Sequence, residues 1–399
     1  QEVARLLRMS PLPAATPDET NRFGDDERAA ALGHRLFFDP RLSSSGTVSC
    51  ATCHDPAQAF TDGRSVAHGV ADGTRNTPTI LNASLLRWYF WDGRVDTQWA
   101  QALVPVENPL EMDFDRVALA RVIHDDAALR VAYEAIFGAM PDLSAAGPFP
   151  ARARPGAEGD PLNTAWMRMS PTEQEAIDRV FANFGKSMAA YERRLRTGPA
   201  PFDRFVEGLR TGDESLQAAI GEDAKRGARL FVGTANCRLC HNGPMLSDGE
   251  FHSIGLPPLD GGPLRDQGRY AGAGTLLADP FNATGAFSDD PNGPRAEQVR
   301  TLRRSPETWG QFRTPSLREV ARTAPYGHQG QIPSLRDFVL HYSTMENAVF
   351  PGHHRETILM PLGLSEQEVR DLVAFLETLS GELPPEGLRR APAPGSSDR

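Results

Sequence analysis

The sequence predicts a mostly helical (mostly α) protein of two domains, and three observations lead to this prediction. Apolar residues recur at helical spacing in several segments, no strand-rich region is visible, and one five-residue motif occurs twice, far apart in the chain. A chain of 399 residues, 40% of them apolar, is long enough to bury a core in each of two domains.

All four cysteines lie in the two copies of this motif, Cys-x-x-Cys-His. In each copy, two thiols can add across the vinyl groups of one porphyrin, and the adjacent histidine is then placed to ligate the iron. A Cys₄ zinc ribbon would not need a histidine after both pairs. The motifs therefore predict two covalently bound c-type haems, one in each cytochrome c-like domain, held by Cys50, Cys53, His54, Cys237, Cys240 and His241.

Covalent attachment of this kind takes place outside the bacterial cytoplasm, so we expect an exported, periplasmic protein. The first residues show no basic segment followed by an apolar run, which is typical of a mature chain whose signal peptide has been removed. No stretch of about 18 apolar residues predicts a membrane anchor. The net charge of −10 argues against nucleic acid as a partner and favours a partner with a basic patch.

The elements of the first half follow in chain order. Residues 29–38 predict a helix that ends before Pro40, because the residue before a proline avoids helical geometry. The Pro/Gly/Ala-rich stretch 145–161 predicts an inserted surface loop. Ser170 and Glu173 form a capping box, which predicts the start of a long amphipathic helix.

In the second half, the turn residues 198–201 mark the change of domain. An apolar pattern over 224–231 predicts a helix before the second motif, and Ser365 with Glu368 predicts the cap of the last helix. The predicted divisions are an N-terminal haem domain over 23–200, a C-terminal haem domain over 201–386 and a flexible tail over 387–399.

Five further motifs accompany the haem motifs, and together they resemble the bacterial di-haem cytochrome c peroxidases and their relative MauG. The resemblance covers nearly the whole chain and includes the methanobactin-associated MauG homologues as one subgroup. The motifs are FTDGR at 60–64, RNTPT at 75–79, FWDGR at 90–94, TPSLR at 314–318 and TAPYGH at 323–328.

In that family the N-terminal haem binds peroxide. The resemblance implies that His54 is the proximal ligand of this haem and that Gln101, Pro105 and Glu111 form its distal pocket. Cleavage of the O–O bond requires a proton to move from the inner to the outer oxygen, and a buried carboxylate such as Glu111 can carry it.

Between the two haems, the resemblance places a tryptophan and a calcium ion. Trp91 matches the tryptophan that passes electrons between the irons, although an aromatic core residue would satisfy the same position. Asn76, Thr323 and Pro325 match the Ca²⁺ site, with one side-chain oxygen and two backbone carbonyls. Oxygen ligands without paired carboxylates suit a weakly held Ca²⁺.

The distal ligand of the second, six-coordinate haem separates the two branches of the family. Cytochrome c peroxidases have a methionine sixteen residues after the tyrosine that corresponds to Tyr326, whereas MauG has a tyrosine; here the position is Tyr342. A phenolate stabilises ferric and higher states, and a thioether stabilises ferrous iron. Met345 is the competing ligand, and Tyr342 is favoured.

His68 supports the other branch. It aligns with the peroxidase loop whose histidine caps the peroxide-binding haem in its resting oxidised form, so His68 is either such a cap, ligating haem iron, or a solvated loop residue.

Several aromatic residues and histidines carry weaker predictions. Ala235 stands where MauG has the tryptophan that carries oxidising equivalents to its protein substrate, so another exit route would be needed. The candidates, each also suited to a core position, are Trp99, Trp166 and Trp309. His328 is expected to make a structural or haem-propionate hydrogen bond, and His353 and His354 are expected to be exposed.

These observations are consistent with three functions. The leading one is a MauG-like enzyme that uses hydrogen peroxide to form a high-valent di-haem state and oxidises a partner protein, for example at a tryptophan. The alternative is a di-haem cytochrome c peroxidase that reduces peroxide with electrons from a small cytochrome or cupredoxin. A non-enzymatic electron carrier is disfavoured by Gln101 and Glu111.

Overall fold

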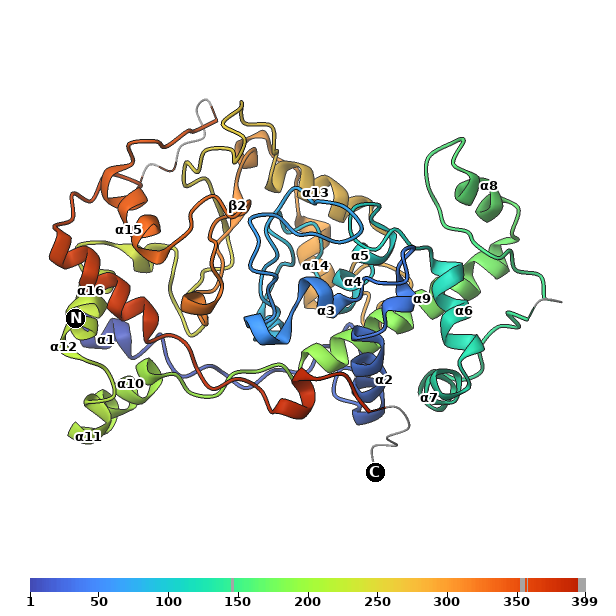
Figure 1. Cartoon of the computed structure of the whole chain (residues 1–399), viewed down its shortest axis with the longest axis horizontal. Helices are drawn as coiled ribbons and strands as arrows, with labels where there is room; N and C mark the ends of the chain where they lie inside the picture. Colours follow the sequence, from blue (N-terminus) through green and yellow to red (C-terminus); the bar gives the residue numbers. More distant parts are fainter. Residues whose placement is uncertain (145–146, 352–355, 357, 394–399) are drawn as a thin grey trace.

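The computed structural model describes residues 1–144, 147–351, 356 and 358–393. In this part of the chain helices dominate, and the strands are the two-residue β1 (Phe251–His252) and β2 (Phe312–Arg313), which pair antiparallel with Phe251 opposite Arg313. The prediction of a mostly helical fold is confirmed (Figure 1). None of the described helices is both long and apolar enough to cross a membrane.

The N-terminal core forms where α2 (Glu27–Phe37) crosses α9 (Pro171–Glu192). The crossing is close at Gly33, where a Cβ atom would lie 1.9 Å from the carbonyl oxygen of Ser187. A residue with a side chain cannot occupy this point unless the helices separate. The helix α9 begins with the predicted capping box of Ser170 and Glu173, so that prediction is confirmed.

The C-terminal core repeats this arrangement with α12 (Glu222–Val232) and α16 (Glu366–Glu377). A Cβ atom on Gly227 would lie 1.9 Å from the carbonyl oxygen of Asp371. Both helices were predicted, and Ser365 caps α16 with Glu368 as expected. In both halves, the helix that precedes a Cys-x-x-Cys-His motif therefore crosses a later helix at a glycine.

Each end of the chain packs against the opposite half of the molecule. The N-terminal α1 (Glu2–Leu6) packs with the C-terminal core, and Arg5 donates to the carbonyl of Val232 at 2.7 Å. The C-terminal η7 (Glu386–Arg389) packs on the N-terminal core, where the Tyr191 hydroxyl donates to the carbonyl of Leu388 at 2.5 Å (Figure 1). The prediction of a flexible tail from 387 is therefore wrong for its first residues, because Leu388 is held by tertiary contacts.

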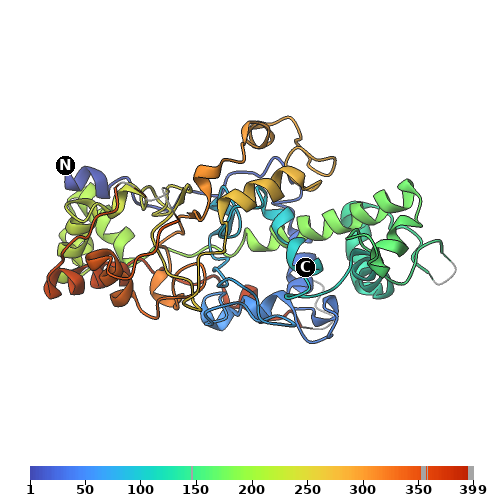
Figure 2. The ribbon, with the colours of Figure 1, turned by 90° about the horizontal axis from the view of Figure 1, so that it is seen from above.

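One further segment joins the two halves. The segment that contains α13 and α14 leaves the C-terminal half, and Phe281 and Phe287 join the N-terminal core (Figure 2). In the predicted loop 145–161, the described residues form no helix before α8, and the Ala153 N–H donates to Asp115. The helices are α3 (Cys50–Cys53), α4 (Gln98–Gln101), α5 (Val104–Glu107), α6 (Arg116–Asp125), α7 (Ala127–Phe137), α8 (Pro161–Met167), α10 (Pro201–Thr211), α11 (Glu214–Gln217), α13 (Arg269–Ala278), α14 (Pro294–Thr301) and α15 (Leu335–Thr344).

Candidate haem sites

The first Cys-x-x-Cys-His motif forms the short helix α3, and His54 follows it. The His54 Nδ1 atom lies 3.1 Å from the carbonyl oxygen of Phe60. Because a carbonyl can only accept, Nδ1 carries the hydrogen and Nε2 keeps its lone pair. Burial lowers the pKa of His54, so the ring is neutral. This histidine is therefore prepared to ligate a metal through Nε2.

The second motif has the same construction. The His241 Nδ1 atom lies 2.9 Å from the carbonyl oxygen of Leu246, and burial lowers the pKa of His241. A carbonyl that accepts from one ring nitrogen fixes the tautomer of a metal-binding histidine and leaves the other nitrogen for the metal. The residues of both motifs therefore fit covalent haem, with two thiols and one oriented imidazole in each.

The predicted distal residues of the first site lie on consecutive elements. Gln101 ends α4, Pro105 lies in α5, and Glu111 lies in the turn that follows. The turn folds back on α5, because the Met112 N–H donates to the carbonyl of Pro105 at 3.2 Å. The turn thus brings the segment of Glu111 beside Pro105, while Gln101 lies at the end of the preceding helix.

Glu111 lies close to the first pair of cysteines. Burial raises the pKa of Glu111, while the charge of Arg94 and a 2.7 Å hydrogen bond from Asn108 partly oppose this effect. The negative charge of Glu111 in turn contributes to raising the pKa values of the Cys50 and Cys53 thiols. A buried carboxyl whose pKa is raised, lying beside the haem motif, is suited to accept and return a proton.

The loop that carries His68 lies against this site. The Val70 N–H donates to the carbonyl of Glu111 at 2.8 Å, and the Cys53 Sγ lies 3.5 Å from the carbonyl oxygen of His68. The imidazole itself is 46% exposed and pairs with Asp72 at 2.6 Å. The backbone of the loop therefore touches the site, while the His68 ring faces Asp72 and the solvent.

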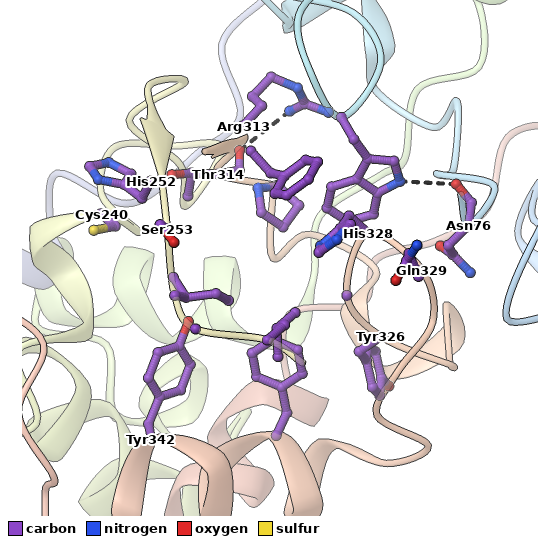
Figure 3. Close-up of a pocket in the computed structure, with 18 of the residues that line it drawn as sticks. Asn76, Cys240, His252, Ser253, Arg313, Thr314, Tyr326, His328, Gln329 and Tyr342 are labelled. Carbon is purple, nitrogen blue, oxygen red and sulfur yellow. Dashed lines mark hydrogen bonds between the residues drawn. The ribbon is translucent and has the colours of Figure 1, made fainter. Parts of the chain in front are cut away.

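A cavity of about 1,220 Å³ surrounds the second motif (Figure 3). Tyr342 reaches its wall from α15, whereas Met345, which caps this helix in a left-handed conformation, is not among the lining residues. Burial raises the pKa of Tyr342 well above its usual range. The predicted site residues that line this cavity are Asn76, Trp91, Cys237, Cys240, His241, Thr323, Pro325 and Tyr342.

Trp91 and Asn76 are joined directly. The Trp91 indole N–H donates to the backbone carbonyl of Asn76 at 2.9 Å (Figure 3). The Asn76 side-chain amide donates to the carbonyl of Arg64 at 2.8 Å, and the Asn76 backbone N–H donates to the carbonyl of His328 at 2.9 Å. Because the amide NH₂ is used in this way, the side-chain carbonyl oxygen of Asn76 is the atom that suits a cation ligand, for example for Ca²⁺.

The other predicted residues occupy varied positions. Trp99 and Trp166 are buried in the N-terminal core and Trp309 is half-buried, which fits their reading as packing residues. His328 stacks on Phe312 with ring centres 3.7 Å apart. Ala235 is buried and lines the second cavity. His353 and His354 lie outside the described residues.

Two features of the second site were not predicted. Arg313 is a buried cation in the cavity wall. His252 lies between two carboxylates, with Nε2 2.9 Å from Asp248 and Nδ1 3.0 Å from Glu356. Because carboxylates only accept, both ring nitrogens carry hydrogens, and these partners raise the pKa of His252. No local pattern indicates either feature, since Glu356 and Phe90, which complete the surroundings of His252 and Arg313, lie far away along the chain.

Comparison with known proteins agrees with these two sites. The profile of the family described as di-haem cytochrome c peroxidase matches residues 27–211. The chain is 33% identical to the methylamine utilization protein MauG of Methylorubrum extorquens, with 96% of this chain and 86% of that protein covered. It is 32% identical to the cytochrome c551 peroxidase of Pseudomonas aeruginosa, with 90% and 80% covered.

Solved structures give the same result. A MauG-like protein associated with microbial copper homeostasis superposes with a TM-score of 0.65 at 26% identity, over 96% of this chain and 97% of that one. The diheme peroxidase BthA of Burkholderia thailandensis shares the fold, with a TM-score of 0.65 at 23% identity over 93% and 94%. From these similarities and the two motif sites, the chain belongs to the di-haem cytochrome c peroxidase family and is a peroxidase-type oxidoreductase with two haem groups.

Proposed function

We propose that the protein is a MauG-like enzyme. The first motif, with His54, would hold a haem that supplies oxidation by hydrogen peroxide, the second motif, with His241, would hold a haem that shares the oxidising equivalents, and the substrate would be a partner protein oxidised at long range. The observation that carries this choice is the position of Tyr342 in the wall of the second cavity, where Met345 is not a lining residue.

Tyr342 suits a metal-bound phenolate. Burial raises its pKa, so the free side chain keeps its proton at neutral pH and forms the phenolate only where a metal cation replaces that proton. When bound, the haem supplies a redox-active iron, and an anionic oxygen ligand favours its more oxidised states. Tyr342 would thereby adapt the second site to sharing oxidising equivalents rather than to collecting electrons from a small cytochrome.

At the first haem, the chain supplies the proton transfer. His54 would hold the haem iron through its Nε2 lone pair, and Glu111 with Gln101 is assigned to the peroxide pocket. Glu111 accepts the proton from the inner oxygen of peroxide and returns it to the outer oxygen, which leaves as water. Its pKa, raised by burial, favours the return step.

Trp91 and the calcium residues connect the haems in this proposal. The Trp91 indole, tied to Asn76, provides the orbital path between the irons. Asn76, Thr323 and Pro325 supply the oxygens for one Ca²⁺, which would hold the two halves of the site together.

The proposed partner is a protein that is oxidised at an aromatic side chain such as tryptophan. The similarity to MauG of Methylorubrum extorquens and to the MauG-like protein of copper homeostasis supports this class of substrate and the methanobactin-associated subgroup. Covalent haem attachment supports a periplasmic location for the reaction.

A second candidate function is peroxide removal by a cytochrome c peroxidase. It is favoured by the backbone contacts of the His68 loop with Glu111 and Cys53, and by the 32% identity to the peroxidase of Pseudomonas aeruginosa. In this alternative the loop moves His68 onto or away from the iron, and a small reduced cytochrome or cupredoxin supplies electrons.

The two candidates differ in their need for an electron. We would measure peroxide consumption with a reduced small cytochrome as donor, with and without prior one-electron reduction of the protein. The MauG-like function predicts slow turnover in both cases and no effect of His68→Gly. Rapid turnover that requires prior reduction, and that changes its activation in His68→Gly, would establish the peroxidase instead.

A further inference from the structure

Arg313 brings a positive charge into the wall of the second cavity. Its side chain lies on β2 and only 6% of the residue is exposed. The guanidinium Nε donates to the carbonyl of Phe90 at 3.3 Å, and Nη1 donates to the carbonyl of Thr314 at 3.3 Å. Both acceptors are neutral, and no described residue accepts a hydrogen bond from Nη2.

Several other buried arginines are paired with carboxylates: Arg318 binds Asp203 at 2.7 Å, and Arg116 binds Glu107 at 2.7 Å. Arg269 is also buried without a described ion pair, but it does not line this cavity. No described carboxylate makes an ion pair with Arg313, and burial lowers its pKa to about 10. A guanidinium stays protonated at neutral pH, and a buried charge without a counter-ion is costly, so this side chain is built to meet an anion.

The cavity itself indicates which anion. Cys237 and Cys240 lie in its wall and would fix the vinyl edge of a porphyrin. A porphyrin carries its two propionates on the edge away from the vinyl groups, and Arg313 offers a buried cation in the wall of the same cavity (Figure 3). Guanidinium and carboxylate form strong, charge-assisted hydrogen bonds when water is excluded.

We propose that Arg313 binds a propionate carboxylate of the C-terminal haem. The inference rests on the proposed haem site at Cys237, Cys240 and His241. The Arg313 backbone N–H also donates to the carbonyl of Trp91 at 2.7 Å, so the same residue ties the propionate edge to the Trp91 segment. Arg313 is thus a haem-binding residue that also positions the bridge between the haems.

This contact has two measurable consequences. A cation beside the haem favours the ferrous form, which has one positive charge fewer, so loss of the cation should lower the reduction potential of this haem. A cation also holds the pKa of the propionate below its usual range, so its loss should make the potential vary with pH where the propionate now titrates.

The test compares Arg313→Met with Arg313→Lys and with the control Arg269→Met. Arg269 is equally buried, at 4% exposed, and its guanidinium donates to the carbonyl of Gly93 at 2.6 Å, but it does not line the cavity. The measurements are the haem content by mass, the potential of the second haem between pH 5 and 8 (about the range of partly buried acids), and the propionate bending band in resonance Raman spectra.

We expect two haems in every variant, a lower and pH-dependent potential in Arg313→Met, partial recovery in Arg313→Lys and no change in Arg269→Met. In the unaltered protein, the propionate band should shift when H₂O is replaced by D₂O, because guanidinium protons exchange; this measurement needs no variant to fold. An unshifted band, or Arg313→Met with an unchanged potential, would overturn the inference. A spectral change that requires added acetate would show that Arg313 binds an external carboxylate instead, and absence of the second haem would refute the haem site itself.

Discussion

Replacement of Glu111 by glutamine removes a proton carrier and preserves its packing. The Asn108 side chain donates to Glu111 Oε1 at 2.7 Å, and a glutamine can accept the same hydrogen bond through its amide oxygen. The cysteines and His54 are unchanged, so we expect the Glu111→Gln protein to retain both haems and its resting spectrum. Only the step in which a proton moves between the peroxide oxygens should be affected.

The expected magnitude follows from general acid–base catalysis, which contributes about 10²–10⁴-fold. At about 1.36 kcal/mol per tenfold, this range corresponds to a barrier increase of about 2.7–5.4 kcal/mol. Burial raises the pKa of Glu111, so the unprotonated form that accepts the first proton increases with pH through a range above that of an ordinary glutamate. The rate in the unaltered protein should therefore rise with pH across this range, and the rate in Glu111→Gln should not.

Stopped-flow mixing with peroxide would measure both effects. Glu192→Gln is the matched control. Glu192 is also a buried carboxyl whose charge raises the pKa of Cys50, and burial raises its own pKa to about 7. It lies on α9, however, where it accepts a hydrogen bond from Gln98. We expect this control to react at the normal rate. Equal rates for Glu111→Gln and the unaltered protein, or a loss in Glu192→Gln of the same size, would refute the assignment of proton transfer to Glu111.

Three further predictions address the haems and the fold. Cys237→Ala with Cys240→Ala should leave the mass of one haem in the denatured protein; retention of two would contradict the attachment site. Tyr342→Phe should change the low-spin ferric signal of the second haem, measured by electron paramagnetic resonance, and an unchanged signal would show that Tyr342 is not bound. Gly227→Ala places a Cβ 1.9 Å from a carbonyl of α16, so we expect a loss of at least about 1–3 kcal/mol in unfolding free energy, measured by denaturant titration, whereas Gly221→Ala meets open space and should cost far less.

Local chemistry made much of the fold and site predictable. The Cys-x-x-Cys-His spacing is imposed by the covalent chemistry of haem, and the capping boxes at Ser170 and Ser365 are complete within four residues. Such features depend on neighbours in the sequence and therefore survive without knowledge of the fold.

The parts that could not be predicted depend on distant partners. Leu388 accepts a hydrogen bond from Tyr191, almost half a chain away, and no local pattern in the predicted flexible tail indicates this contact. One of the two carboxylates that pair with His252 is the distant Glu356. Arg313 is informative because it lines the cavity and no described carboxylate makes an ion pair with it. No sequence pattern indicates that a buried arginine lacks a counter-ion, because this is a property of the assembled cavity.

The most direct test of a shared di-haem state is to add one equivalent of peroxide to the fully ferric protein without any reductant. We expect spectral changes at both haems and an oxidised state that decays slowly in the absence of a partner protein, because in the proposed function Tyr342 favours oxidised iron at the second site and Trp91 connects the two haems. A ferric protein that stays unchanged with peroxide until one electron is supplied would contradict the MauG-like function.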